Sequence, residues 1–242
     1  LAPYVREADA WVFSRAAYAW PQLEPERGWI MPPAIDPFSP KNQDLDADQQ
    51  GAILATVGLG PPAPAKAPLF TRADGSPGRV ERRAELVQER PIPAGARVIA
   101  QVSRWDRLKD HHGVLECFGR HLEDERLHLL LAGPSTAAVA DDPEGAAVWA
   151  GVAAAWSRLP GPVRGRVHLA SLSMDDLEEN AAVVNAIQRR ADVVVQKSLA
   201  EGFGLTVAEA MWKGRPVIGS RVGGIQDQIV DGTSGVLVDP HD

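Results

Sequence analysis

Short apolar runs alternate with amphipathic stretches through the second half of the chain. Apolar, β-branched runs predict buried strands at residues 97–103, 127–132, 167–170, 192–196, 216–219 and 236–238. Apolar residues at helical spacing predict helices over residues 110–122, 144–159, 175–190, 206–214 and 225–230. Because strands that alternate with helices form right-handed βαβ units, the pattern predicts an α/β fold, a Rossmann-like open parallel sheet with helices on both faces.

The first 96 residues lack this regular alternation. Residues 1–28 contain one predicted strand, and we interpret them as the tail end of a missing N-terminal domain with its linker. Residues 29–242 are expected to form one ligand-binding domain, with an irregular insertion at about 38–96. Within the insertion, the sequence predicts a short helix over 46–57 and a charged surface helix over 79–90.

One stretch, residues 197–219, combines a strand end, a loop with two glycines and a helix start. Glycines let backbone N–H groups approach a ligand closely, and a helix N-terminus favours anions. Two carboxylates, Glu201 and Glu209, flank the segment 202–206. A carboxylate only accepts hydrogen bonds, so it can take two adjacent O–H groups of one ligand. The alternative for Glu209 is a capping box with Thr206, in which it only closes the helix start.

Two cations, Arg104 and Lys109, follow the predicted strand at 97–103. Ligands of open parallel sheets bind at the carboxyl ends of the strands, where these side chains would lie. Fixed cations stabilise negative charge on a ligand. Both residues are therefore candidates for an anion-binding site, whereas a solvated role suits Arg107 better.

Together these motifs resemble the donor-site signature of retaining GT-B glycosyltransferases, the glycosyl transferases group 1 family. Three further segments look most like the trehalose-forming synthases and trehalose phosphorylases of that family, namely residues 101–104, 141–145 and 195–198. The resemblance implies that residues 29–242 are the C-terminal, nucleotide-sugar-binding half of a GT-B fold. It covers residues 97–109 and 190–238 most tightly.

The resemblance also implies a role for each matching residue. Glu201 would contact hydroxyls of the transferred sugar, Glu209 the ribose diol, and Arg104 with Lys109 the diphosphate, so that Arg104, Lys109 and Glu201 carry the reaction. The backbone around the glycines would face the sugar and diphosphate, and the loop at the end of the strand at 167–170 would contact the base. These further donor-binding candidates are Gly202, Phe203, Gly204, Leu205, Thr206 and Leu172.

The reaction implied is transfer of a hexosyl group, glucosyl by preference, from a nucleotide-diphosphate sugar to a sugar acceptor with retention of configuration; trehalose is one product that this allows. No metal is implied. The acceptor site would lie in the missing N-terminal domain, so this chain alone is expected to bind nucleoside diphosphate without transferring sugar. Two alternatives stay open, a non-catalytic nucleotide-sugar binding module and a sugar-nucleotide epimerase. A GxGxxG fingerprint and a Gly-Lys-Ser/Thr phosphate loop are both absent.

Net charge, hydrophobicity and cysteine content limit the classes of partner that this chain can have. The net charge of −7 argues against nucleic acid and anionic membrane surfaces, and the chain has no apolar run of about 18 residues that could span a membrane. The single cysteine, Cys117, excludes an intrachain disulfide and is compatible with the cytoplasm. The expected partners are a nucleotide sugar and a sugar acceptor, and a homo-oligomer is left open. Acidic residues at 141–145 suggest a helix cap rather than a metal site, and His111 and His112 are expected to be solvated.

Overall fold

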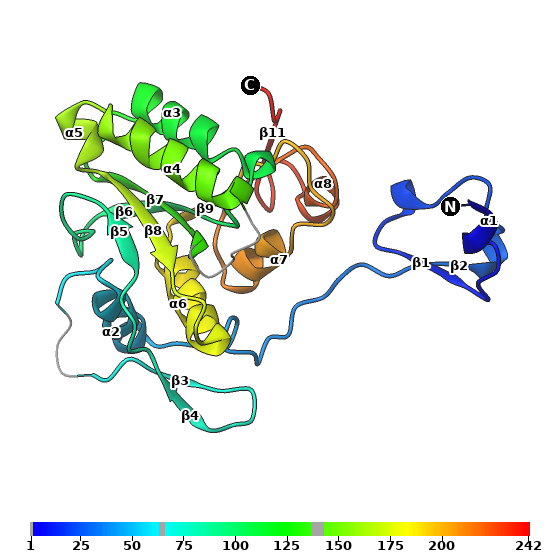
Figure 1. The fold of residues 1–242 in the computed structure, drawn as a ribbon, viewed down its shortest axis with the longest axis horizontal. Helices are drawn as coiled ribbons and strands as arrows, with labels where there is room; N and C mark the ends of the chain where they lie inside the picture. The colour runs from blue at the N-terminus through cyan, green and yellow to red at the C-terminus, as the bar shows by residue number, and fades with distance from the viewer. Residues whose placement is uncertain (1, 63–65, 137–142) are drawn as a thin grey trace.

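The computed structural model describes residues 2–62, 66–136 and 143–242 (Figure 1). Its main body is built on a seven-stranded sheet in the order β11-β10-β9-β6-β7-β8-β5. Six of these strands are parallel, and their bounds are β6 Arg97–Val102, β7 Leu127–Pro134, β8 Val167–Leu172, β9 Val193–Gln196, β10 Val217–Ser220 and β11 Val236–Val238. β5 (Glu85–Val87) pairs antiparallel to β8 at one edge.

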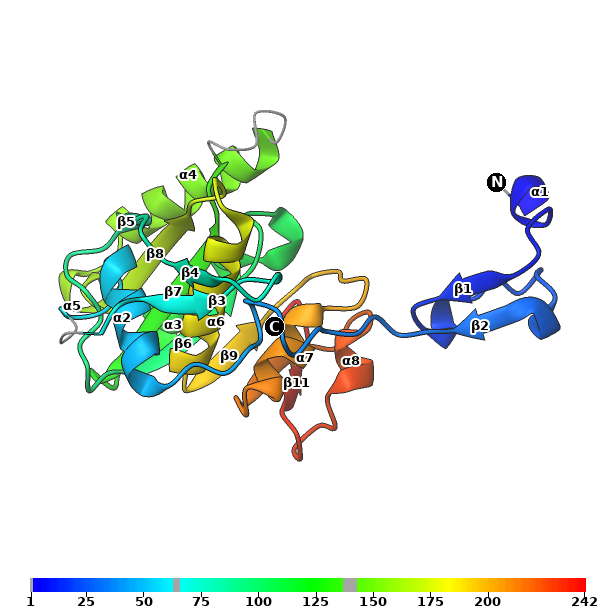
Figure 2. The same ribbon diagram turned by 90° about the horizontal axis from the view of Figure 1, so that it is seen from below.

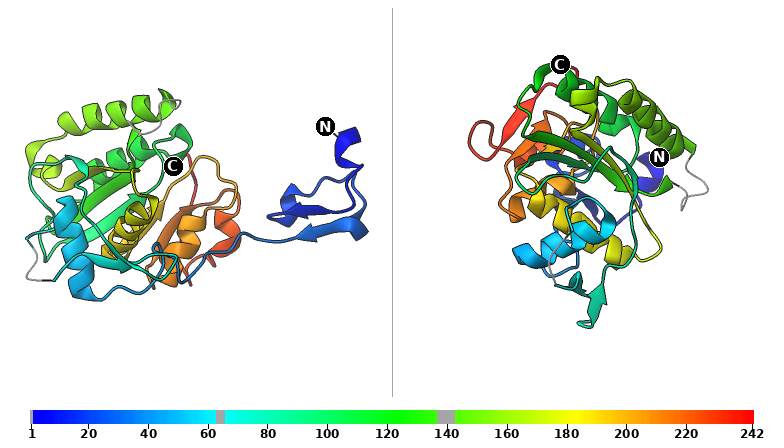
Figure 3. Two further views of the ribbon diagram at one scale, coloured as in Figure 1. Left: turned by 60° about the horizontal axis from the view of Figure 1, so that its bottom comes forward. Right: turned by 90° about the vertical axis from the view of Figure 1, so that its left-hand side faces the viewer.

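Helices cover both faces of the sheet (Figures 1 and 3). On one face lie α3 (His111–His121), α4 (Pro143–Ser157) and α5 (Gly161–Arg164). On the other lie α2 (Ala47–Val57), α6 (Leu177–Arg190), α7 (Leu205–Trp212) and α8 (Ile225–Gln228). β7 supplies both cores, because Leu130 packs with α2 and α6 whereas Leu131 packs with α3 and α4. The predicted fold class is confirmed, and every helix and strand predicted after residue 96 is present.

The predicted surface helix over residues 79–90 is wrong. This segment holds the end of a hairpin, β3 (Leu69–Thr71) with β4 (Pro77–Arg79), and then β5. Leu86 of β5 pairs with Ala170 of β8, which hides backbone groups that β8 would otherwise leave unpaired at the edge of the sheet. Strand pairing between β5 and β8, which are far apart in the sequence, therefore overrides the helical preference expected for the charged segment.

The N-terminal residues form a small unit beside the main body (Figures 1 and 2). It contains α1 (Ala2–Val5) and two parallel strands, β1 (Trp11–Phe13) and β2 (Gly28–Ile30), with short 3-10 turns at Ala16–Tyr18 and Pro25–Arg27. Arg15 forms an ion pair with Asp227, with Nε 2.6 Å from Oδ2. The Tyr18 hydroxyl donates to the carbonyl oxygen of Gly202 over 2.8 Å. This unit therefore touches the loop that the sequence analysis singled out.

The strand order defines where a ligand can enter. From β6 the chain runs outward to β7 and β8, then returns to β9 on the other side of β6. The loops after β6 and β9 leave in opposite directions, and such a switch point opens a crevice at the carboxyl ends of the strands. Throughout residues 2–62, 66–136 and 143–242, no helix has the length and apolar character needed to cross a lipid bilayer.

Candidate functional site

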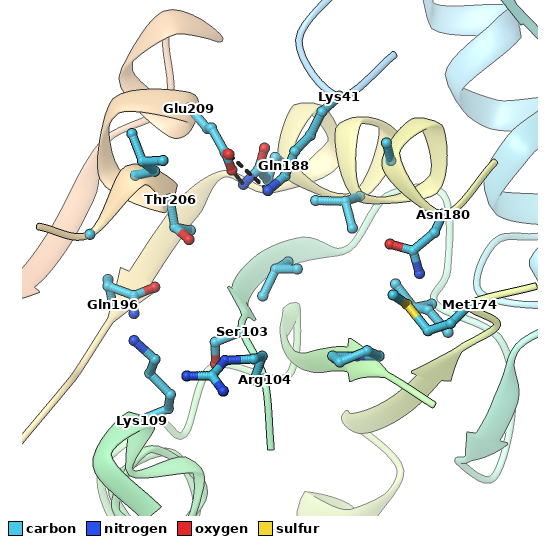
Figure 4. Close-up of a pocket in the computed structure, with 18 of the residues that line it drawn as sticks. Lys41, Ser103, Arg104, Lys109, Met174, Asn180, Gln188, Gln196, Thr206 and Glu209 are labelled. Atoms are coloured by element: carbon cyan, nitrogen blue, oxygen red, sulfur yellow. Dashed lines mark hydrogen bonds and ion pairs between the residues drawn. The ribbon is translucent and has the colours of Figure 1, made fainter. Parts of the chain in front are cut away.

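A cavity of about 550 Å³ opens at the carboxyl ends of β6 and β9 (Figure 4). Most of the residues singled out from the sequence line it: Arg104, Lys109, Leu172, Glu201, Gly204, Leu205, Thr206 and Glu209. Gly202 and Phe203 are not in its lining. Their carbonyl oxygens instead hold the loop in place, by accepting hydrogen bonds from Tyr18 and from Gln228 respectively.

One end of the cavity carries the predicted cations. Lys109 Nζ forms an ion pair with Glu201 Oε2, and both side chains are largely buried, with 14% and 15% of their area exposed. The backbone N–H of Gly202 donates to Glu201 Oε1 over 3.1 Å. Arg104 is 71% exposed and lies 3.4 Å from Asp106. The site therefore combines a largely buried, paired cation with an exposed one that a ligand can reach.

Backbone and side-chain hydrogen bonds join the two loops that meet here. The buried Gln101 amide donates to the Lys109 carbonyl oxygen over 2.7 Å. The Leu199 N–H, after β9, donates to the Leu108 carbonyl oxygen, after β6, over 2.7 Å. Asp106 caps the 3-10 turn Arg107–Lys109 by accepting from the Leu108 N–H. The spacing of Arg104 and Lys109 from Glu201 is thus built into the fold.

The end of β7 passes close beneath these loops. A Cβ placed on Gly133 would lie 2.4 Å from the Ser103 carbonyl oxygen, so the approach requires glycine. Trp105 is buried below and donates from Nε1 to the Pro134 carbonyl oxygen over 3.0 Å. Gly133 and Pro134 both line the cavity, and the missing side chain of Gly133 lets the end of β7 approach the loop after β6.

The other end of the cavity is built around Glu209 (Figure 4). This residue is only 4% exposed. Its Oε1 lies 2.8 Å from Lys41 Nζ, and its Oε2 accepts from Gln188 over 3.1 Å. The alternative that Glu209 is merely a helix cap is wrong, because α7 begins after Gly204, at a φ of +84°, with no side-chain cap. Its carboxylate is directed at Lys41 and Gln188, which also line the cavity, and not at the start of the helix.

Two polar side chains in the wall were missed from the sequence, Gln196 and Gln188. Each is almost fully buried, and in the part of the chain that the structure describes neither Oε1 has a hydrogen-bond partner. The Gln196 amide donates from Nε2 to Ser198 Oγ over 3.1 Å. Unpaired buried acceptors are costly, so both favour a ligand that brings O–H or N–H donors. A glutamine after the apolar run of β9 was the signal that could have identified Gln196.

The expectation of solvated histidines is wrong for His111, although His112 is exposed. His111 Nε2 lies 3.1 Å from the Ser103 hydroxyl, and burial lowers its pKa to about 4. It is therefore neutral at physiological pH. Of the acidic cluster, Asp141 and Asp142 lie outside the described residues. Among the described residues, no three His, Cys, Asp or Glu side chains are grouped to hold a metal ion.

Comparison with known proteins places this site in context. A family model described as glycosyl transferases group 1 matches residues 96–242. The trehalose synthase of Pyrococcus horikoshii is 36% identical over 238 residues, which are 97% of this chain and 46% of that protein. The trehalose synthase of Rubrobacter xylanophilus is 36% identical over 240 residues, 98% of this chain and 46% of that protein. The chain thus spans about half the length of these curated relatives.

Solved structures agree on the fold. The crystal structure of Anabaena HepE in complex with UDP and glucose superposes with a TM-score of 0.64 over 97% of this chain and 50% of that one. The two sequences are only 15% identical, so the likeness concerns the fold alone.

Proposed function

The chain belongs to the glycosyl transferases group 1 family, and we propose that it carries the donor site of a retaining hexosyltransferase. Its donor would be a nucleotide-diphosphate sugar, with glucose as the sugar and UDP as the first nucleotide to test. Its acceptor would be another sugar, with trehalose as a product. The relatives named trehalose synthase support this choice of product, and HepE, which was crystallised with UDP and glucose, supports the choice of donor.

A single observation carries the proposal. Arg104 and Lys109, from the loop after β6, share one cavity with Glu201 and Glu209, from the segment after β9. Cations at one end suit a diphosphate, and the buried carboxylate at the other suits the ribose diol. We further propose that residues 29–242 are this donor-binding unit, and that 1–28 belong with the part of the protein that binds the acceptor.

The chemistry follows from these positions. The bond between the sugar's anomeric carbon and the diphosphate oxygen breaks, and a bond to the acceptor oxygen forms on the same face. The acceptor proton passes to the departing diphosphate, and Arg104 and Lys109 stabilise the charge on that group. Glu201 orients the sugar by accepting from its hydroxyls. In this scheme neither carboxylate transfers a proton.

We expect the chain to bind UDP, ADP or GDP in calorimetry, and UDP-glucose in the same cavity. The chain alone is expected to turn over no sugar nucleotide with glucose as acceptor, because we propose that the acceptor site lies partly outside it. Absence of binding for all three diphosphates would contradict the proposal. Epimerised sugar nucleotide, detected by chromatography, would favour the epimerase alternative instead.

Replacing Glu209 with glutamine tests the ribose contact. A glutamine accepts on one atom and donates from the other, so one ribose hydroxyl would face an N–H group. We expect binding of the nucleoside diphosphate to weaken by about 1–3 kcal/mol, the cost of leaving a buried polar group unsatisfied. Calorimetry with the 2′,3′-dideoxy nucleotide should show the same loss against the unsubstituted chain and little further loss against Glu209→Gln.

The cycle has its own internal control, because protein and ligand each lose the same contact. Independent, additive losses from the variant and from the dideoxy nucleotide would mean that Glu209 does not bind the ribose. Thermal unfolding should confirm that the Glu209→Gln chain is folded.

A further inference from the structure

We propose that Lys41 is a positioning residue of the donor site, which holds the Glu209 carboxylate ready for the ribose diol. The inference rests on the proposed function and deepens it. Lys41 lies in the insertion that precedes residues 96–242, the part matched by the family model. Its Nζ nevertheless lines the cavity, 2.8 Å from Glu209 Oε1 (Figure 4).

The turn that carries Lys41, residues 36–44, is fixed by side chains from two helices. From α6, Asn185 donates to the carbonyl oxygens of Pro40 and Gln43 over 3.1 and 2.8 Å, and Arg189 donates to that of Gln43 over 3.0 Å. From α7, Trp212 Nε1 donates to the Asn42 carbonyl oxygen over 3.2 Å. Because both neighbours of Lys41 are anchored in this way, the side chain has a defined origin at the rim of the cavity.

Asn42, next in the chain, is anchored from α7 as well. Lys213 Nζ donates to Asn42 Oδ1 over 2.8 Å, and Asn42 is almost completely buried. Lys213 follows α7, the helix that carries Glu209. The turn that carries Lys41 and the Glu209 carboxylate are thus held by the same helix, α7, which fixes the position of Lys41 relative to Glu209.

The Glu209 carboxylate needs Lys41 as a counter-ion because it is buried away from solvent. Glu209 has only 5% of its side chain exposed, whereas Lys41 has 39%. A buried charge without a counter-ion is strongly unfavourable. An ionised carboxylate has about four acceptor positions, so contacts to Lys41 and Gln188 leave two for the ribose hydroxyls. With Lys41 and Gln188 each directed at one oxygen, the free positions point in a set direction.

The chain offers a matched comparison in Lys66. Its Nζ also lies 2.8 Å from a carboxylate, that of Asp46, in the same insertion. In that pair both side chains are about half exposed, at 50% and 54%, and Lys66 does not line the cavity. The two pairs thus share their N–O distance but differ in burial and place, and exposed pairs contribute little to stability.

The test is calorimetry on the full chain with UDP, ADP and GDP, followed by the 2′,3′-dideoxy form of whichever binds most tightly. Lys41→Met should weaken binding of the ribonucleotide by about 10- to 100-fold, as expected when a contact to a charged group is lost. Binding of the dideoxy nucleotide should weaken by no more than about 3-fold, because no diol is left to lose. Lys41→Arg should restore most of the affinity, and Lys66→Met should leave both unchanged.

The outcomes separate the inference from the function on which it rests. If the unsubstituted chain binds none of the three diphosphates, the proposed function fails and takes this inference with it. If it binds, and Lys41→Met weakens binding of the ribonucleotide and of the dideoxy nucleotide equally, or weakens neither, Lys41 does not act through the Glu209 carboxylate. Should Lys41→Met unfold below the assay temperature, Lys41→Gln takes its place, and the same ratio of affinities decides.

Discussion

Lys109→Met is expected to weaken binding of a nucleoside diphosphate by about 1.5–3 kcal/mol, the range for a hydrogen bond that involves a charged group. The change removes a cation from the proposed diphosphate end of the cavity. It also leaves Glu201, whose side chain is 15% exposed, without its counter-ion, so that an unpaired carboxylate faces the phosphates. Calorimetry with UDP measures the loss of affinity. Because Lys109 is largely buried, a thermal unfolding curve must also show that the Lys109→Met chain is folded.

Arg107→Met is the matched control for this experiment. Arg107 lies in the same 3-10 turn as Lys109, but its side chain is 78% exposed and pairs only loosely with Glu144, at 3.8 Å. The substitution removes the same formal charge from the same loop, but Arg107 does not line the cavity. Equal losses in both variants would show that net charge, and not a contact of Lys109, controls binding.

Gly223→Ala is expected to lower the free energy of unfolding by on the order of 3 kcal/mol or more and to impair donor binding. Gly223 has a φ of +48°, where an alanine pays about 1–2 kcal/mol. Its new Cβ would also lie 1.7 Å from the Glu201 carbonyl oxygen, so the backbone of Glu201 must move. That movement would take the Glu201 carboxylate away from Lys109. Chemical denaturation and UDP-glucose calorimetry measure the two effects.

Gly232→Ala separates the two causes. Gly232 is also left-handed, with a φ of +75°, but nothing lies within 4 Å of a Cβ built on it. It should lose only the backbone part, about 1 kcal/mol, and bind the donor normally. If both variants lose the same stability and neither loses donor binding, the contact between Gly223 and Glu201 has no functional consequence.

Much of the site could be predicted because it lies in short stretches of sequence. Arg104 and Lys109 come from one loop, and Glu201 and Glu209 from one loop and its helix. Parallel strands bring their carboxyl ends to one edge, so the fold class was enough to place these groups near one another. The resemblance to a known family added their expected roles, which stay predictions until ligand binding is measured.

Other features depended on contacts between residues far apart in the chain. The sequence could not decide between cap and ligand for Glu209, since Thr206 and Glu209 satisfy the pattern of a capping box. The structure excludes the capping box, because α7 begins after Gly204 with no side-chain cap, and the Glu209 carboxylate contacts Lys41 and Gln188, which lie outside that motif. Equally, nothing in the charged run before residue 90 shows that β8 has an edge to be paired.

By itself, then, the sequence determined the alternation of strands and helices, because hydrophobic periodicity reports which face of each element is buried. It also determined the local chemistry of the two loops at the switch point. Only the tertiary structure decided which side chains meet across the cavity. Lys41 with Glu209 and Lys109 with Glu201 are brought together by tertiary packing, which no local periodicity of the sequence specifies.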